Sequence, residues 1–527
     1  MSSHLPVLIV GAGPTGLMMA CELARFHIPF RIIDKNPQPT SASNATWIQT
    51  GSLELFDHVG IVNQFLKRGH RCDAINLYSH GKALVQIPFA HLDSSYPYVL
   101  MMPQSETEKL LTEHLEKSKH KVDRSLELID VKQQDNQVIS TIRHANGKTE
   151  TITSDWLIAC DGVNSSIRQK FSIDFPGVEL SEQFMVADAE MNSFQPRNEI
   201  NVFFDKETIF AAFPLGDNKY RIFANLHQSH PRKIFIEKEV KEIVDERARG
   251  EFHVNSISWI SPFWTHSRIV DNMRHGSIFF AGDAAHIHAA VGGQGMNTGL
   301  QDAYNLIWKI ALVHNGKAQP SLLDSYQAER HPVISKIVNQ TERFTKMAVS
   351  NDQFLMKLRD FGYRLSHSEK QTSKKFSMEI TQLNTDYRES PAIDYQEKIT
   401  TKSPRQGMRA PDVVMNESKR LYDYLRGTTH HVLLFTGVGE NCDLSLVEPM
   451  QQWLQKYVDL IHSQIVSSVK LDKKSNIIFD TDAIIHKRYN IKYPVIYIIR
   501  PDNIIAFCSK DLNIESVEKF LKTYLFV

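Results

Sequence analysis

A glycine-rich loop near the start of the chain has the spacing of a dinucleotide-binding turn. In Gly11-x-Gly13-x-x-Gly16 the first glycine permits a tight turn and the second lets a pyrophosphate approach the backbone, while the third allows close helix–strand packing. Asp34 follows about twenty residues later, where a carboxylate can accept ribose hydroxyls. A glycine turn without a ligand is the alternative, and the loop alone does not separate FAD from NAD. The expected cofactor contacts here are Gly11, Gly13, Pro14, Thr15, Gly16, Asp34 and Lys35.

Two later segments again pair glycine with aspartate. They are Asp161-Gly162 and Gly282-Asp283, and the second is soon followed by the glycine-rich run 292–297. A helix N-cap is the alternative role for Asp283. In this order and at these separations, the three segments indicate a chain that contacts one long cofactor from end to end, which favours FAD.

The elements that must position these segments are short buried strands and helices. Residues 6–10 form an apolar run typical of a parallel strand, 16–26 read as a helix and 30–34 as the next strand, which together make one βαβ unit. The runs 155–160 and 277–281 are also of the buried-strand type. The chain is therefore predicted to be an α/β protein with a Rossmann-like core.

The middle and the end of the chain differ from this core. Aromatic-rich runs at 200–204, 209–213 and 220–224, separated by turn signals, predict a small antiparallel sheet. Helical patterns dominate from Gly299 to about Glu389, and a polar stretch at 390–407 marks a boundary. A small separate α/β domain follows, with strands expected at 431–435, 464–468, 495–499 and 504–507.

Composition excludes several functional classes. The chain has 527 residues, enough for two to four domains, and its 60 basic and 60 acidic residues argue against a nucleic-acid footprint or a polybasic membrane surface. The 5 scattered cysteines contain no Cys-x-x-Cys pair, which fits reduced thiols in the cytoplasm. The apolar stretch 5–23 resembles a signal peptide, but no Lys or Arg precedes it and glycines and a proline interrupt it. We expect a cytoplasmic protein without a membrane span.

Four segments carry a resemblance to a known family. Residues 160–168 (CDGVNSSIR), 282–286 (GDAAH) and 292–309 (GGQGMNTGLQDAYNLIWK), together with Pro103-Gln104, are similar to the motifs of group A flavoprotein monooxygenases. These are aromatic hydroxylases with the para-hydroxybenzoate hydroxylase fold, and the resemblance covers about residues 5 to 345. It implies non-covalent FAD, with a ribityl hydroxyl on Asp283 and a helix N-terminus near Gly295 facing the isoalloxazine. The cofactor contacts that it adds are Gln104, Asp283, Gly293, Gly295, Met296 and Asn297.

The resemblance also implies the reaction. NAD(P)H, docking transiently without a domain of its own, would reduce the flavin, and O2 would form a C4a-hydroperoxide that hydroxylates an aromatic or polycyclic phenol-like substrate. No catalytic base is identified. The alternatives are a flavin oxidoreductase that inserts no oxygen, and a flavin-binding protein with little turnover. The expected substrate pocket consists of Trp47, Phe210, Ala212, Pro214, Phe223 and Ala290.

The same comparison divides the chain. The expected parts are a discontinuous FAD-binding domain (1–75, 100–183 and 271–345), a mainly β substrate domain (76–99 and 184–270), a helical segment and linker (346–400), and a C-terminal domain (401–527). The last part is similar to the thioredoxin-like tail of the phenol-hydroxylase branch. Without Cys-x-x-Cys it cannot exchange dithiols, so we expect a structural or homodimer-supporting role.

The chain departs from the family pattern at several positions. Asn44 and Gly51 stand where relatives carry arginines, Ala290 replaces a proline, and Thr46 stands where a phenol hydroxylase has an aspartate. His286-x-His288 has the spacing of a metal pair, but no further ligand clusters nearby, so no metal is expected.

Overall fold

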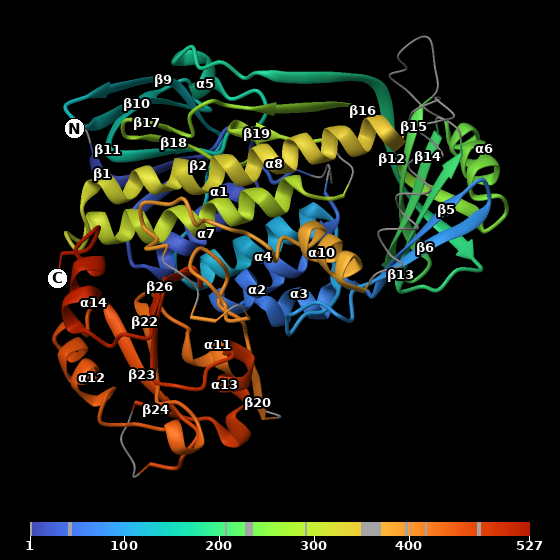
Figure 1. Cartoon of the computed structure of the whole chain (residues 1–527). Helices are drawn as coiled ribbons and strands as arrows, with labels where there is room; N and C mark the ends of the chain where they lie inside the picture. Colours follow the sequence, from blue (N-terminus) through green and yellow to red (C-terminus); the bar gives the residue numbers. More distant parts are fainter. Residues whose placement is uncertain are drawn as a thin grey trace.

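The computed structural model describes residues 3–40, 45–205, 208–226, 236–289, 292–348, 370–395, 399–400, 402–416, 419–471 and 476–526. Figure 1 shows three parts: a body of sheet and helices, a sheet set apart from it on one side, and a C-terminal unit packed below the body.

A parallel sheet forms the centre of the body. The apolar run that ends at Val10 places β1 between β11 and β2, and parallel pairing gives the order β18-β11-β1-β2-β8, with β17 antiparallel at one edge and β10 and β9 branching from β11. Val7, Leu8 and Ile9 are fully buried because both faces of this sheet are covered. The strands are β1 (Ser3–Val10), β2 (Phe30–Asp34), β8 (Asp123–Arg124), β9 (Leu126–Gln134), β10 (Gln137–His144), β11 (Thr149–Ala159), β17 (Arg274–His275) and β18 (Ile278–Phe280).

Helices cover this sheet and carry the glycine segments. α1 packs against α4 and α7, and the long α7 lies alongside α8 (Figure 1). The strands β3, β7 and β4 form a separate three-stranded sheet in the order β3-β7-β4. Their bounds are α1 (Pro14–Arg25), β3 (Trp47–Ile48), α2 (Thr50–Val59), α3 (Val62–Arg68), β4 (His70–Cys72), β7 (Val99–Met101), α4 (Gln104–Lys117), α5 (Ser166–Lys170), α7 (Gly295–His314), α8 (Ser325–Ala348) and α10 (Lys370–Ile380).

The second sheet has eight strands in the order β19-β16-β12-β15-β14-β13-β5-β6. It is therefore larger than the small sheet predicted, and it is antiparallel except where β13 pairs with β5 in parallel. One face packs against α6 (Glu237–Ala248) and the other turns toward the body. The strands are β5 (Ala74–Ser79), β6 (Lys82–Pro88), β12 (Gly177–Ser193), β13 (Glu199–Asp205), β14 (Thr208–Gly216), β15 (Lys219–Leu226), β16 (Phe252–Ile269) and β19 (His286–Ile287).

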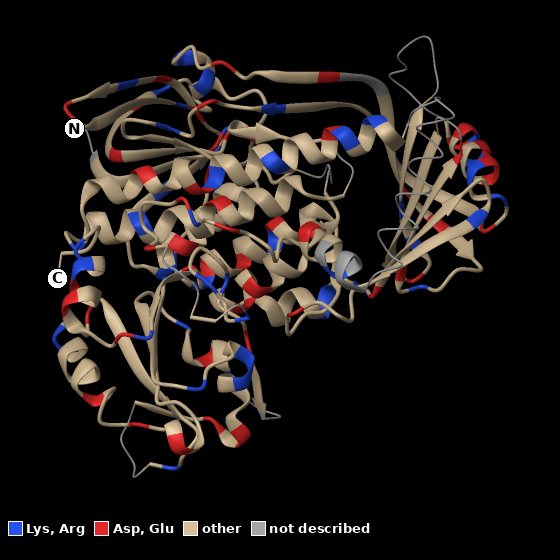
Figure 2. Cartoon of the chain, in the orientation of Figure 1, with Lys and Arg blue, Asp and Glu red and all other residues tan. Residues whose placement is uncertain are grey.

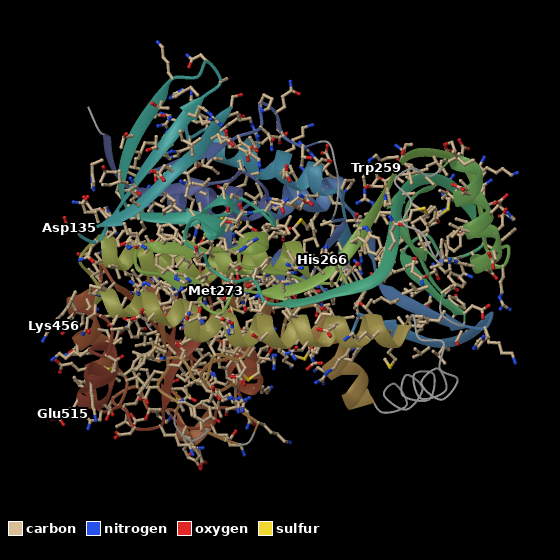
Figure 3. All side chains as sticks on the ribbon, turned by 90° about the horizontal axis from the view of Figure 1, so that it is seen from above. Asp135, Trp259, His266, Met273, Lys456 and Glu515 are labelled. Atoms are coloured by element: carbon tan, nitrogen blue, oxygen red, sulfur yellow. The ribbon has the colours of Figure 1, made fainter. Side chains whose placement is uncertain are left out.

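Two long strands join the second sheet to the body. β12 and β16 pair antiparallel from Gly177 opposite Arg268 to Ser193 opposite Phe252, with register shifts along the way. In Figure 1 they run together across the top of the molecule from the body into the second sheet. Figure 3 shows Trp259 and His266 on β16 along this stretch.

The C-terminal unit has its own five-stranded sheet in the order β24-β23-β22-β25-β26, with β22, β23 and β24 parallel and β25 and β26 antiparallel. Its elements include β20 (Val414–Asn416), β21 (Lys419–Arg420), α11 (Leu421–Tyr424), β22 (His430–Phe435), α12 (Glu448–Leu454), β23 (Ile461–Ser467), β24 (Ile477–Phe479), α13 (Ile484–Tyr489), β25 (Val495–Ile499), β26 (Ile505–Ser509) and α14 (Ile514–Leu521). The separate α/β unit expected after the polar stretch is therefore present.

Buried charges fasten this unit to the body. Arg500 lies 2.6 Å from Glu329 on α8 and 2.5 Å from Asp502, while Lys309 on α7 lies 2.8 Å from Glu329. Burial alone would raise the pKa of Glu329, but Arg500 and Lys309 outweigh it and hold that pKa below its ordinary value. Because Arg500 shares the same carboxylate, burial and this second cation lower the pKa of Lys309 to about 8.

The surface and the thiols are unremarkable. In Figure 2 acidic and basic residues are mixed over the three parts of the molecule. All five cysteines are free, and burial raises the pKa of Cys21, Cys72, Cys160 and Cys508. Within the described residues, no helix has both the length and the apolar character that a membrane crossing requires.

Candidate functional site

A cavity of about 1180 Å³ lies between the body and the second sheet. Its walls come from the β1–α1 loop, the start of α7, the inner face of the second sheet, and parts of α8 and α10. The volume exceeds the usual range for a single drug-sized ligand. The cavity is therefore large enough for a substrate beside the reactive end of a cofactor.

In the first glycine loop, close backbone contacts leave no room for a side chain at two of the glycines, and the third has free space beside it. A Cβ atom at Gly11 would lie 2.2 Å from the Cys160 carbonyl oxygen, and one at Gly16 would lie 1.9 Å from the Gly11 oxygen. A Cβ at Gly13 would meet no protein atom within 4 Å, and Gly13 lines the cavity. The loop thus leaves space at the glycine where a pyrophosphate is expected to approach, directly before the N-terminus of α1. Pro14 and Thr15 line the same end of the cavity.

Asp34 at the end of β2 also supports the loop itself. Its Oδ2 accepts the Ala12 N–H at 2.7 Å and its Oδ1 accepts the Asn36 N–H at 2.8 Å. Asp34 is half-buried and Lys35 is exposed, and neither is among the residues that line the cavity. Both lie at the strand end next to the loop, which keeps them within the region expected for a ribose.

Gln104 and Asp283 both line the cavity. Gln104 begins α4, where its Oε1 accepts the Ala45 N–H at 3.2 Å and its Nε2 donates to Glu108 at 2.8 Å. The side chain of Asp283 is exposed to the cavity. The surrounding protein nevertheless buries its carboxylate enough to raise its pKa, and His286 acts in the opposite direction. Asp283 is thus a carboxylate for which a hydroxyl donor would be favourable.

The predicted helix start is confirmed, because α7 begins at Gly295. No side chain caps its N-terminus, so the first N–H groups and the positive end of the helix dipole face the cavity wall formed by Gly293, Gly295 and Met296. Asn297 is committed elsewhere: its Oδ1 accepts from Gln49 and Ser52, and its Nδ2 donates to backbone oxygens of residues 47 and 293. Only its backbone remains for a cofactor.

Two of the six residues expected in the substrate pocket line the cavity. Trp47 and Phe223 line the cavity, and the buried Trp47 Nε1 has no hydrogen-bond partner among the described residues. Phe210 and Ala212 do not line the cavity, because they pack in the core between the second sheet and α6. Pro214 is the next residue of the same alternating set on β14, and it does not line the cavity either. Their neighbours Ile209, Ala211 and Phe213 face the cavity instead. Ala290 and Asn44 lie outside the described residues.

The difference between the expected and the observed lining of β14 has a simple physical cause. Successive side chains of a strand point to opposite faces, so assigning the wrong face moves every residue of the strand. β14 is apolar on both faces because α6 covers one face and the cavity lies at the other. The sequence of such a strand cannot indicate which alternate set faces a ligand.

Arg221 on β15 was missed by sequence reasoning. This nearly fully buried arginine lines the cavity, and its guanidinium donates to both oxygens of Asp188 at 2.7 Å. It also donates to Thr46 Oγ1 at 2.5 Å and lies 5.5 Å from the Trp259 ring. The available signal was a lone charge in an otherwise apolar run. Arg221 supplies positive charge to the cavity wall at Thr46.

Gly51 explains one departure from the family pattern. Its N–H donates to the Thr381 oxygen at 3.0 Å, and a Cβ there would lie 3.1 Å from the carbonyl oxygens of Thr381 and Gln382. Gln382 in turn donates to Gln294 and Thr298 at the start of α7, both at 2.9 Å. The backbone after α10 therefore occupies the space into which a side chain at residue 51 would point.

A metal centre was not expected. Among the residues that the structure covers, no three His, Cys, Asp or Glu side chains are grouped so that they could hold a metal ion.

The family model described as "FAD binding domain" matches residues 4–341. The chain belongs to this family. Its cofactor is therefore FAD, and the open glycine loop, the cavity-facing Asp283 and the uncapped start of α7 fit that group.

Curated relatives and solved structures agree with this assignment. The chain is 32% identical over 436 residues to the "uncharacterized aromatic compound monooxygenase YhjG" of Bacillus subtilis, covering 81% of this chain and 84% of that protein. It is 31% identical over 484 residues to a "12-dehydrotetracycline 5-monooxygenase/anhydrotetracycline 6-monooxygenase" of Streptomyces rimosus, covering 88% and 90%. The structure of OxyS anhydrotetracycline hydroxylase from Streptomyces rimosus superposes with a TM-score of 0.77 at 25% identity, covering 99% of both chains.

Proposed function

We propose that this chain is an FAD-dependent monooxygenase that uses NAD(P)H and O2 to hydroxylate an aromatic or polycyclic phenol-like substrate. The observation that carries the proposal is that one cavity has a cofactor wall of glycine loops and helix N-termini and, opposite it, a wall of apolar and aromatic side chains. Relatives whose names describe monooxygenases of aromatic and tetracycline-type compounds support the same reaction class.

The residues of the cofactor wall would hold FAD without a covalent bond. The loop at Gly13 and the N-terminus of α1 would hold the pyrophosphate, Asp283 would accept a hydrogen bond from a ribityl hydroxyl, and the start of α7 would stabilise negative charge on the ring. When bound, FAD supplies hydride acceptance and oxygen activation. The protein holds the reacting groups together and excludes water from them.

The opposite wall would orient the substrate. Ala211, Phe213 and Phe223 offer an apolar surface on which a planar ring can lie, with Trp47 at its edge. The ion pair between Arg221 and Asp188 gives this wall a polar point beside Thr46.

The C-terminal unit is proposed to be a thioredoxin-like domain with a structural role. Its mixed sheet and its lack of Cys-x-x-Cys support this reading, and its buried ion pairs to α7 and α8 support a stabilising role. The domain boundaries expected from the sequence, and a contribution of this unit to a homodimer, remain predictions.

The test is to purify the protein, record its visible spectrum, and measure NADH and NADPH oxidation with a panel of mono- and polycyclic phenols. We expect a yellow protein whose NAD(P)H oxidation rises at least tenfold with one phenol class and yields oxygenated product. Peroxide without oxygenated product would indicate a flavin oxidoreductase instead. FAD binding without stimulated oxidation would indicate a flavin-binding protein with little turnover.

A further inference from the structure

The wall opposite the cofactor changes in chemical character from one side of the cavity to the other. Three strands, β5, β6 and β13, line the cavity with aliphatic side chains alone, and these residues are here called the aliphatic end: Ile75, Leu77, Ile87, Ile200 and Val202. On the other side, the lining residues of β16 and α8 include Trp264, Gln340 and Arg343, which are exposed. The cavity therefore has an apolar end and an end with exposed polar groups.

The aliphatic end continues a row of paired residues across the sheet. Ala211 on β14 pairs with Val202 on β13, and Val202 pairs with Leu77 on β5. A second row, from β13 to β6, consists of Ile200, Ile75 and Ile87. Paired strands lie about 4.8 Å apart, so the surface from β14 to β6 extends over roughly 14 Å.

The near edge of this surface lies beside the cofactor wall. The ring centroids of Trp47 and Phe213 are 6.3 Å apart, and a Cβ atom at Gly293 would lie 2.7 Å from the Cβ of Trp47. Gly293 precedes the start of α7, where the reactive ring of FAD is expected. A substrate ring beside Phe213 would therefore lie next to the flavin, and the aliphatic end would receive a group attached to that ring.

The aliphatic end can be contacted by a ligand, but it offers no partner to a polar one. Val202 is half-buried, and Ile75 and Leu77 retain 7% and 5% of their accessible surface. β13 and β5 are each paired on both sides, so their backbone groups are engaged in the sheet. A hydroxyl or carbonyl group placed there would lose its hydrogen bonds to water, whereas a hydrocarbon would gain from leaving water.

We propose that the substrate is a phenol that carries a hydrocarbon chain, with its ring beside Phe213 and its chain along the aliphatic end. Polar substituents of the ring then point toward the side of Gln340 and Arg343. The inference rests on the proposed function, because it names the class of substrate for that reaction.

The first experiment measures binding rather than turnover. Phenols with a 4-alkyl chain, from 4-methylphenol to 4-heptylphenol, are titrated calorimetrically into the oxidised, FAD-loaded protein. We expect the dissociation constant to fall two- to fourfold for each added CH2, where fourfold corresponds to about 0.8 kcal/mol. 4-(7-Hydroxyheptyl)phenol has the same chain with a terminal hydroxyl, and it should bind at least tenfold more weakly than 4-heptylphenol. A dissociation constant that does not depend on chain length, or equal binding of these two ligands, overturns the inference.

The second experiment locates the chain. Val202→Phe fills space at the aliphatic end, so the ratio of the dissociation constants of 4-methylphenol and 4-heptylphenol should fall at least tenfold. Val254 supplies the matched control, because it is a half-buried valine on β16 that packs toward the α6 core. Val254→Phe should leave that ratio within about twofold. An equal fall in both variants would contradict a specific role for Val202.

A milder variant covers the case in which Val202→Phe does not fold. Val202→Thr keeps the shape of the side chain and adds a hydroxyl, and it should lower the same ratio at least threefold. FAD content and melting temperature show whether each variant is folded. An unchanged ratio in a folded Val202 variant overturns the placement of the chain.

Other outcomes separate this inference from the proposed function. Hydroxylation of phenols without any dependence of binding on chain length overturns the inference alone. Chain-dependent binding without stimulated NAD(P)H oxidation or oxygenated product keeps the substrate placement and overturns the monooxygenase. Failure of every phenol to bind contradicts both.

Discussion

One wall of the cavity is formed mainly by backbone and the other by side chains. The cofactor wall is mostly backbone: glycine turns at residues 11–16, the N-terminus of α1 and the uncapped start of α7 at Gly295. The opposite wall consists of side chains on one face of a sheet, such as Ala211, Phe213 and Phe223. Where the backbone forms the wall, close contacts permit few residue types besides glycine, whereas many side chains can form the opposite wall. The cofactor wall therefore corresponds to a recognisable sequence motif, and the opposite wall does not.

The sharpest test of the backbone wall is a pair of glycines. Gly11→Ala places a Cβ 2.2 Å from a carbonyl oxygen at a φ of +103°, so we expect loss of the folded protein. Gly13→Ala meets no protein atom and its φ of −75° suits alanine, so the variant should fold but bind FAD at least tenfold more weakly, about 1.4 kcal/mol. Soluble yield, melting temperature and FAD titration measure both. Normal FAD affinity in Gly13→Ala would contradict the pyrophosphate position.

A second test disrupts the buried ion pairs that join the C-terminal unit to α7 and α8. Arg500→Met leaves Asp502 without its arginine and Glu329 with Lys309 as its remaining cation among the described residues, and breaking such a buried network should lower the free energy of unfolding by about 3–5 kcal/mol. The exposed pair between Lys336 and Glu379 is the control, because Lys336→Met should cost about 0–1 kcal/mol. Denaturant unfolding of the FAD-loaded proteins gives both values.

The same network predicts a pH dependence. The pKa of Glu329 is below its ordinary value in the folded state, so the unfolded chain binds its proton first as the pH falls. Its contribution to stability is therefore present above about pH 4.5 and is lost below it. Glu329→Gln should be less stable at neutral pH and should lose less stability on acidification. Melting temperatures between pH 7 and pH 4 check the sign.

Asp283 tests a charged side chain of the cofactor wall. Asp283→Ala should raise the dissociation constant of FAD by about 13- to 160-fold, which is the 1.5–3 kcal/mol of a hydrogen bond to a charged group. Asp161 is the matched control: it accepts the Ser166 N–H at 2.8 Å at the start of α5 and does not line the cavity. Asp161→Ala should reduce stability and leave FAD affinity nearly unchanged.

The smallest expected effect tests which alternate set of β14 side chains faces the cavity. Ala211 faces the cavity and Ala212 faces the α6 core, one residue apart on β14. Ala211→Leu should change which phenols stimulate NAD(P)H oxidation with little change in melting temperature. Ala212→Leu should instead overpack the core and lower the free energy of unfolding by about 1–3 kcal/mol without a shift in preference. The reverse pattern would restore the assignment made from the sequence.

The fold was predictable wherever strands are fully buried. The runs 30–34 and 495–499 were predicted with the bounds that β2 and β25 have, because apolar residues end abruptly at turn signals. β12 and β16 were not predicted as long strands, since β16 mixes buried and exposed residues without a strict alternation. In the candidate site, Gly13 could be predicted from the spacing of the first glycine loop, and Gly295 from the family resemblance. Arg221 could not, because its partners Asp188 and Thr46 lie 33 and 175 residues away in the sequence.

The paired strands β12 and β16 have a mechanical consequence for the enzyme. They form one ribbon that carries the substrate wall and is anchored in the body, and each strand is continuous across the span. The two walls of the cavity therefore cannot move apart by rotation about a single loop; the ribbon must bend or twist. Such deformation is easiest at register shifts such as that between Asp188 and Ala189, where ladder pairing is interrupted. Asp188 also holds Arg221, so flexing of the ribbon would alter the charge presented to a bound substrate.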